Sequence, residues 1–204
     1  MAAAEKLDLY KRHKAEYVAR KKPVLVEVGP AKYLTIVGTA PPEGTEFQAR
    51  IQAMYSTAFT IKMTRKFAGK GDYKVCHMEG LWWSGRKTTD FLEVPKSQWK
   101  WKLLIRVPDF ITDRDLTEAK QALRKKAKPP EFEQVALEQI AEGRCVQMLH
   151  VGPYSREHET IAQMHAFAEA EGLRIHGRHH EIYLSDPRRV PPERLRTILR
   201  HPVR

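Results

Sequence analysis

One pattern occurs twice in the chain and constrains its fold more than any other feature. In each copy a Val-Gly-Pro turn follows an apolar run, a helical stretch follows the turn, and a strand-like run with a glutamate closes the pattern. The first copy reads VEVGP…HMEGLWW and the second LHVGP…HHEIYLS, which pairs Glu79 with Glu181. The two glutamates lie at different distances from their turns, so the match is one of topology. It predicts an internal duplication of a β-α-β-β module.

The turn and helix signals divide the chain into an arm and two modules. Residues 1–22 are highly charged and predict an N-terminal helical arm. Residues 23–128 hold the first module and a following amphipathic helix, which the Pro129-Pro130 pair stops. Residues 129–204 hold the second module. We therefore expect an α+β protein of two tandem β-α-β-β modules with pseudo-twofold symmetry and a ligand site where the modules meet.

Composition and charge narrow the class of protein. The 204 residues are 42% hydrophobic and 30% charged, which is typical of a soluble globular protein. No apolar run approaches the roughly 18 residues of a membrane span, and the N-terminus has no secretory signal pattern. The two cysteines, Cys76 and Cys145, lie far apart and form no CxxC motif. A reducing, cytoplasmic location is the simplest expectation.

The net charge of +11 raises the question of a nucleic-acid partner. The basic residues are dispersed along the chain, and zinc-finger spacing, RNP-like aromatic motifs and a long basic helix are all missing from the sequence. The charge is therefore interpreted as solvated surface that keeps the protein in solution, and nucleic acid is not the expected partner.

The segment HHEIYLSD near the C-terminus separates polar from apolar side chains. In a strand, His179, Glu181 and Tyr183 point to one side, while His180 and Ile182 point to the other. The polar side faces either water or a cavity. In an aromatic cavity the carboxylate of Glu181 would lose hydration, its pKa would rise and it would become a base near neutral pH. Tyr183 could donate a hydrogen bond to a water or to a developing anion.

The tryptophans are the second feature that indicates a ligand site, because all four fall within 20 residues of the chain. They could stack on a planar ligand or pack in the core of a sheet. Trp83 and Trp101 are the leading candidates for a ligand wall, since each shares a strand face with other large side chains. Tyr55, on the first long helix, could line either the pocket or the core.

Other polar residues carry weaker signals. Glu79 could share a proton with Glu181 if the pseudo-twofold axis brings them together, or it could pair with a basic residue. His150 and Tyr154 flank the second Val-Gly-Pro turn. His150 could orient a group in the cleft or play a structural role, and Tyr154 could reach the rim of the cleft.

The histidine cluster does not predict a metal site. His179 and His180 would face opposite sides of a strand, so they could not easily bind one ion. The sequence contains no HExxH motif and no zinc-binding Cys/His spacing. We therefore expect neither a metal ion nor a cofactor.

Four stretches resemble the GyrI-like small-molecule-binding family, and within it a stand-alone branch that includes cyclopropanoid hydrolases. They are MEGLWW (78–83), WKWKLLIRVPDFIT (99–112), HVGPYSREHETI (150–161) and HHEIYLSDPRR…PERLRTILRHPV (179–203). The resemblance spans most of residues 24–203 and implies a curved antiparallel sheet around a central ligand cleft. Some family members carry a helix-turn-helix module, for which the roughly 23 residues before the first strand are too few.

The resemblance also implies a function. It places Glu181 at the centre of the cleft, where it would act on a water with Tyr183 nearby and with Trp82 or Trp83 stacking on the ligand. We expect binding of planar, lipophilic, aromatic molecules and hydrolysis of electrophilic cyclopropanoid compounds, which would protect against genotoxic or xenobiotic molecules. Two alternatives stay open: a non-catalytic protein that sequesters or senses drugs, and an inhibitor of a partner protein. The chain could be a monomer or a homodimer.

Overall fold

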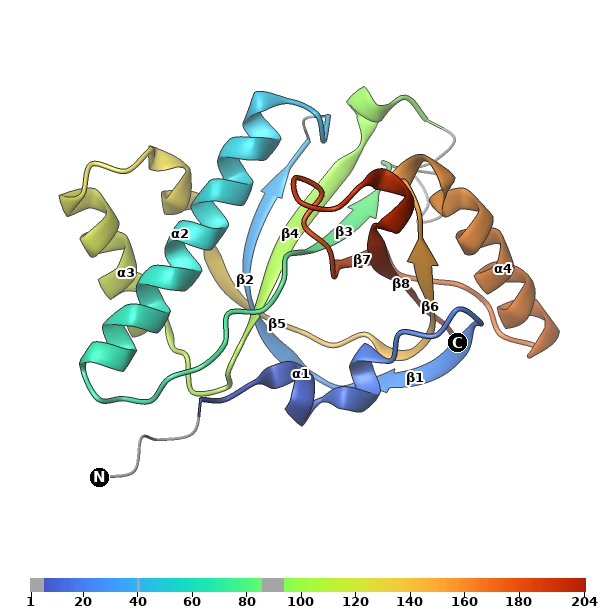
Figure 1. The fold of residues 1–204 in the computed structure, drawn as a ribbon, viewed down its shortest axis with the longest axis horizontal. Coiled ribbons are helices and arrows are strands. Elements are labelled where there is room, and N and C mark those ends of the chain that lie inside the picture. Colours follow the sequence, from blue (N-terminus) through green and yellow to red (C-terminus); the bar gives the residue numbers. More distant parts are fainter. Residues whose placement is uncertain (1–5, 40, 86–93) are drawn as a thin grey trace.

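The computed structural model describes residues 6–39, 41–85 and 94–204, which form one eight-stranded antiparallel sheet with two long helices against one face (Figure 1). The strands are β1 (Val24–Val28), β2 (Ala31–Gly38), β3 (Glu79–Trp83), β4 (Lys100–Val107), β5 (Ala136–Ile140), β6 (Gly143–Val151), β7 (His179–Tyr183) and β8 (Arg196–Pro202). The helices are α1 (Leu9–Arg12), α2 (Thr45–Phe67), α3 (Asp113–Lys125) and α4 (Glu157–Ala170). The predicted α+β class is confirmed.

The order of the strands shows the duplication. It is β1-β6-β8-β7-β3-β4-β2-β5, so β2-α2-β3-β4 and β6-α4-β7-β8 are arranged symmetrically about the β3–β7 pair. The pairing of Val24 with Gln147 continues in one register to that of Thr35 with Ala136. The segments β1-β2 and β5-β6 therefore act as two long bent strands, which curl the sheet.

The residue-by-residue alignment of the two copies was wrong. The first Val-Gly-Pro turn connects β1 to β2, whereas the second connects β6 to the segment that leads into α4. In the β3–β7 ladder Gly80, and not Glu79, lies opposite Glu181. Because a shift of one residue turns a side chain to the other face of the sheet, Glu79 and Glu181 point in opposite directions. They cannot share a proton.

The helices and strands agree with those expected from the sequence except at their ends. Helix α3 begins at a capping box formed by Thr112 and Asp115, and α2 begins after Gly44 without a side-chain cap. The strand-like run HMEGLWW of the first copy forms a strand only over Glu79–Trp83. The described part of the predicted helical arm forms only α1 and a short 3-10 turn.

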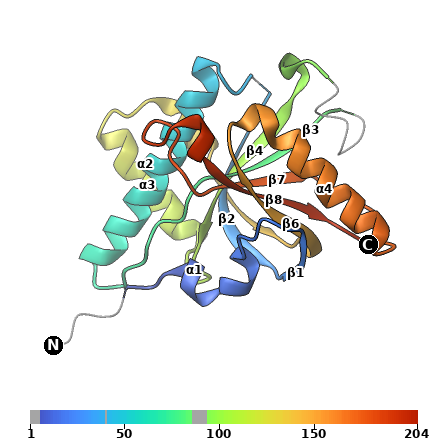
Figure 2. The same ribbon diagram turned by 45° about the vertical axis from the view of Figure 1, so that its right-hand side comes forward.

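The two long helices cover the two halves of the sheet. Helix α2 packs over β2 and β4 around Met54, Leu103 and Trp101, and α3 lies on the far side of α2 (Figure 1). Helix α4 packs over β6 and β8 around Met164 and Leu199 (Figure 2). Strand β7 lies between these two cores, so its side chains on the helix-covered face lie near the edges of both α2 and α4.

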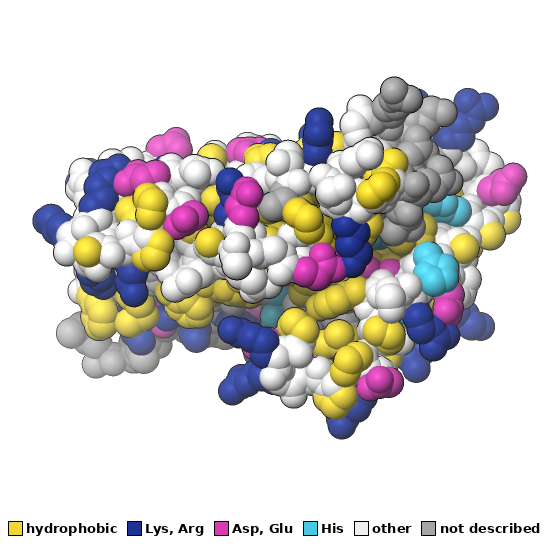
Figure 3. Space-filling view, turned by 90° about the horizontal axis from the view of Figure 1, so that it is seen from above, with side chains coloured by type: hydrophobic (Ala, Val, Ile, Leu, Met, Phe, Trp, Pro, Cys, Tyr) yellow, Lys and Arg dark blue, Asp and Glu magenta, His cyan; other side chains and the backbone are white. Residues whose placement is uncertain are grey.

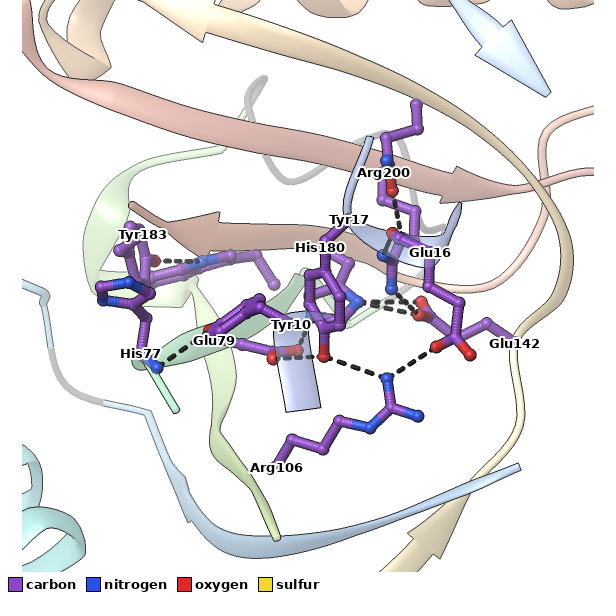
Figure 4. Close-up of polar contacts among 12 residues, drawn as sticks. Tyr10, Glu16, Tyr17, His77, Glu79, Arg106, Glu142, His180, Tyr183 and Arg200 are labelled. Atoms are coloured by element: carbon purple, nitrogen blue, oxygen red, sulfur yellow. Dashed lines mark hydrogen bonds and ion pairs between the residues drawn. The ribbon is translucent and has the colours of Figure 1, made fainter. Parts of the chain in front are cut away.

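Buried charges occupy the opposite face of the sheet, beneath the N-terminal arm (Figure 4). His180 contacts Glu79 at 2.9 Å and Glu142 at 3.0 Å, and Arg200 contacts Glu142 at 2.9 Å. Tyr17 of the arm donates a hydrogen bond to Glu79 at 3.4 Å. The second alternative for Glu79, a partner of a basic residue, is the one observed.

The charges of this network hold one another in their ionised forms. Although burial opposes ionisation, His180 and Arg200 lower the pKa of Glu142 to about 2. Burial also opposes charge on His180, but Glu142 and Glu79 raise its pKa to about 9. The network joins β3, β7 and β8 to the arm and to the turn before β6.

The Glu142→Gln variant should lower the free energy of unfolding by about 3–5 kcal/mol at pH 7, because it leaves two buried cations with less counter-charge. The stabilisation by Glu142 is complete above pH 4.5, its value in the unfolded chain, and is lost as pH falls through about 2. Urea unfolding at several pH values should therefore show the gap between variant and wild type closing toward pH 2. An equal gap at all pH values would contradict this assignment. The exposed Glu169→Gln serves as control.

Gly38 should tolerate no side chain, since a Cβ atom built there would lie 2.2 Å from the ring of Trp101, its partner across the ladder. We expect Gly38→Ala to cost about 1–3 kcal/mol of unfolding free energy by overpacking. Gly29→Ala is the matched control, because a Cβ at Gly29 meets no atom within 4 Å. Equal thermal midpoints for the two variants would contradict the packing argument.

Candidate functional site

A cluster of buried acids lies on the helix-covered face of the sheet, where β7 passes between α2 and α4. Glu181, His179 and Tyr183 point there from β7, and Glu157 reaches the same point from the first turn of α4. Glu181 is 8% exposed, Glu157 6% and His179 0%. Alternation along the strand puts the three β7 side chains on one face, as the sequence predicted, with His180 on the other.

Two carboxyl groups share a hydrogen bond at this point. The side chain of Glu157 bonds to Glu181, and Thr197 of β8 bonds to Glu157. Burial, and then the charge of Glu181, raise the pKa of Glu157 well above its ordinary value. Glu157 therefore carries the shared proton and donates it to the carboxylate of Glu181.

Two further groups contact the Glu181 carboxylate. The Nε2 atom of His179 lies 3.2 Å from Glu181 Oε1. The hydroxyl of Tyr183 donates to Glu181 and accepts a hydrogen bond from the indole of Trp82 at 3.0 Å. Gly80 makes this possible, because a Cβ atom there would lie 2.9 Å from the Tyr183 hydroxyl.

The same donor atoms raise the question of a metal ion. One ligand atom from each of Glu157, His179 and Glu181 lies within 4.8 Å of the other two. A cation held here would need both carboxyl groups ionised and would compete with the proton of Glu157 for the same oxygen atoms.

Aromatic rings surround the acids. Trp82 contacts Phe47 of α2 and Trp99 at ring distances of 5.8 and 5.7 Å. Tyr154, which is 40% exposed, meets Tyr183 edge-to-face at 6.0 Å. Tyr154 thus lies at the outer rim of the site, and Trp82 at its inner wall.

The other predicted site residues lie elsewhere. Trp83 faces the opposite side of the sheet, where the guanidinium of Arg178 lies 3.7 Å from its ring. Trp101 is on the correct face but is fully buried behind Phe47, in the core under α2. Neither of the two leading wall candidates therefore contacts the acids, and Trp82 takes that place. Alternation explains the error for Trp83, since adjacent residues of a strand face opposite sides.

Tyr55 and His150 support the edges of the site. The hydroxyl of Tyr55 accepts a hydrogen bond from the backbone N–H of Met78 at 3.2 Å, and its ring packs half-buried against the core under α2. The ring nitrogens of His150 lie 2.9 Å from the Thr160 hydroxyl and 3.2 Å from the carbonyl oxygen of Pro153. His150 thus holds the turn that leads into α4, which is the structural alternative for this residue.

Glu157 is the residue that sequence reasoning missed. It lies in the HVGPYSREHETI stretch, and Glu157, Ile161, Met164 and Ala168 recur at helical spacing on the buried face of α4. A carboxylate at the head of an apolar stripe was the available signal, because a charge on the inward face of a helix needs a buried partner.

On the face of the molecule seen from above, the lysines and arginines of the described residues are dispersed among acidic and hydrophobic groups (Figure 3). Among the described residues, none of the helices is long and apolar enough to cross a membrane.

Comparison with known proteins gives a consistent result. Two crystal structures of hydrolases from Listeria innocua are 40% and 39% identical to this chain, cover 98% of it over their whole length, and superpose with TM-scores of 0.87 and 0.88. The EcmrR C-terminal domain shares the fold at 11% identity, covering 90% of this chain and 97% of that domain, with a TM-score of 0.58. A search of curated proteins gave no match. The GyrI-like small molecule binding domain matches residues 21–204, and the chain belongs to that family.

Proposed function

We propose that this protein is a hydrolase that binds planar, lipophilic molecules between α2 and α4 and opens an activated cyclopropane ring with water. The observation that carries the proposal is the Glu181 carboxylate, which is buried, surrounded by aromatic rings, hydrogen-bonded to Glu157 and Tyr183, and 3.2 Å from Nε2 of His179. Similarity to the Listeria innocua hydrolases supports a hydrolytic reaction. The role that follows is protection against electrophilic, genotoxic compounds.

In the proposed reaction Glu181 acts as the base. It takes a proton from a water molecule, whose oxygen bonds to a ring carbon as the strained carbon–carbon bond breaks. The electron pair of that bond moves through the conjugated system to the carbonyl oxygen, which must then receive a proton. Tyr183 orients Glu181, and Trp82 and Tyr154 supply flat surfaces for the ring system.

Glu157 keeps Glu181 in its working state. As a neutral acid it donates a hydrogen bond to the carboxylate without adding a second negative charge. With Glu157 neutral the site carries one negative charge instead of two, so it attracts an organic cation less strongly than an ionised pair of carboxylates would.

Turnover of a chromogenic, cyclopropane-bearing dienone tests the proposal. We expect product with the wild-type protein and at least a 100-fold lower kcat with Glu181→Gln, because the amide cannot take the proton. Tryptophan fluorescence should still be quenched by the compound, since Trp82 remains in place. The exposed Glu159→Gln on α4 is the control variant.

Other outcomes of this assay separate the alternatives. Full turnover by Glu181→Gln would remove the catalytic role of Glu181. Quenching without product in either protein would instead identify a binding protein that sequesters or senses its ligand.

Glu157→Gln should stabilise the protein at neutral pH. Because the pKa of Glu157 is raised by folding, this group favours the unfolded chain increasingly as pH rises above 4.5, its value there. A neutral amide removes that penalty, and we expect a gain in the free energy of unfolding at pH 7 that disappears below pH 4. Denaturant unfolding of both proteins across this range is the measurement. A loss of stability at pH 7 would show that Glu157 is ionised in the folded protein.

A further inference from the structure

Three histidines form a chain of contacts that leads from Glu181 to the surface. Glu181 Oε1 lies 3.2 Å from Nε2 of His179 on β7. The other nitrogen of His179, Nδ1, lies 2.8 Å from Nε2 of His201 on β8. His201 Nδ1 in turn lies 3.1 Å from Nε2 of His165 on α4. Each inner ring therefore uses both nitrogens to join two partners.

The chain crosses from the interior to solvent. His179 and His201 are 0% and 1% exposed, and His165 is partly exposed on α4. The rings are also packed together, with centroids 4.7 Å apart for His179 and His201 and 5.2 Å apart for His201 and His165. Three different elements contribute one ring each, so the chain depends on the tertiary fold.

The contacts permit only two arrangements of protons in three neutral rings. Either every ring carries its proton on Nε2, with His179 donating to the Glu181 carboxylate, or every ring carries it on Nδ1, with His179 accepting from a protonated Glu181. A mixed chain would place two protons or two lone pairs face to face. Passing one proton along the chain converts one arrangement into the other.

We propose that His179, His201 and His165 form a proton relay between Glu181 and solvent. This inference rests on the proposed function, in which Glu181 takes a proton from water inside a buried site. It assigns positioning and proton-transfer roles to His201 and His165, neither of which touches the substrate.

The relay balances the reaction from a resting state in which Glu181 is a carboxylate and every ring carries its proton on Nε2. In the inward step His179 Nε2–H passes its proton to Glu181, His201 Nε2–H passes one to His179 Nδ1, His165 Nε2–H passes one to His201 Nδ1, and water supplies one to His165 Nδ1. The Glu181 proton passes to the carbonyl oxygen of the substrate as the ring opens, and Glu181 takes a proton from the attacking water. In the outward step that proton passes to His179 Nε2, the other transfers reverse, and His165 Nδ1–H releases a proton to water, so the rings again carry their protons on Nε2.

One proton in and one proton out per turnover restore the starting state and leave the net proton count unchanged, which agrees with the addition of water to a ring. No oxidant or reductant takes part. Burial and then His179 lower the pKa of His201 well below its ordinary value, and burial lowers the pKa of His165. Both rings are therefore neutral in their resting form and pass a proton on without retaining it.

The test removes the outermost ring. His165→Ala should lower kcat for the cyclopropane-bearing dienone by about tenfold or more in weakly buffered solution, with KM unchanged, because proton exchange with solvent becomes slow. Added imidazole at millimolar concentration should restore most of the loss. His158→Ala is the matched control, since His158 is exposed on the same helix and its Nδ1 atom lies 3.0 Å from the backbone oxygen of Ser155. Circular dichroism checks that both variants fold.

The outcomes are distinct. No turnover by the wild-type protein would overturn the proposed function. Turnover by the wild type with an unchanged kcat in His165→Ala, or a loss that imidazole does not rescue, would overturn the relay alone. Nitrogen-15 NMR of the imidazole rings gives a readout independent of activity: the relay requires the same tautomer in His179, His201 and His165, and mixed tautomers would overturn it.

Discussion

The buried ion network beneath the N-terminal arm is the interaction on which the site depends. His180 is held between Glu79 and Glu142, and Glu142 also holds Arg200. Because side chains alternate along a strand, fixing His180 on one face fixes Glu181 on the other. A slip of β7 by one residue would bury Glu181 among the anions of the network and leave His180 in the aromatic site. The network therefore sets the register that places the carboxylate.

The site itself combines an acid and a carboxylate in one hydrogen bond. Glu157 retains its proton since burial and the neighbouring charge of Glu181 both oppose its ionisation. One negative charge then remains, and three groups from two elements, Glu157 of α4 and His179 and Tyr183 of β7, contact it. Such an arrangement keeps a base ready in an apolar environment, where an unpaired carboxylate would be costly. The proposed histidine relay would connect this base with water.

Much of the fold could be predicted from the sequence. Hydrophobic periodicity located the two long helices, the Pro129-Pro130 stop and the strands around Glu79 and Glu181. The sequence predictions were wrong where they relied on aligning the two copies residue by residue. Similar Val-Gly-Pro turns marked non-equivalent positions, and the match between the two glutamates was off by one residue. A one-residue offset is invisible in a weak repeat, yet it decides which face of the sheet a side chain occupies.

The sequence by itself determined which side chains of β7 act together, because the two-residue period of a strand puts His179, Glu181 and Tyr183 on one face whatever surrounds them. It could not determine what meets them. Glu157 is 24 residues before Glu181 in the chain, and His201 lies on another strand. Only the packing of α4 against the sheet brings these groups within hydrogen-bonding distance. The tertiary structure also decides that Trp82, and not Trp83 or Trp101, lies beside the acids. A ring can stack on a ligand there only if it is on the correct face of the sheet and at the correct depth.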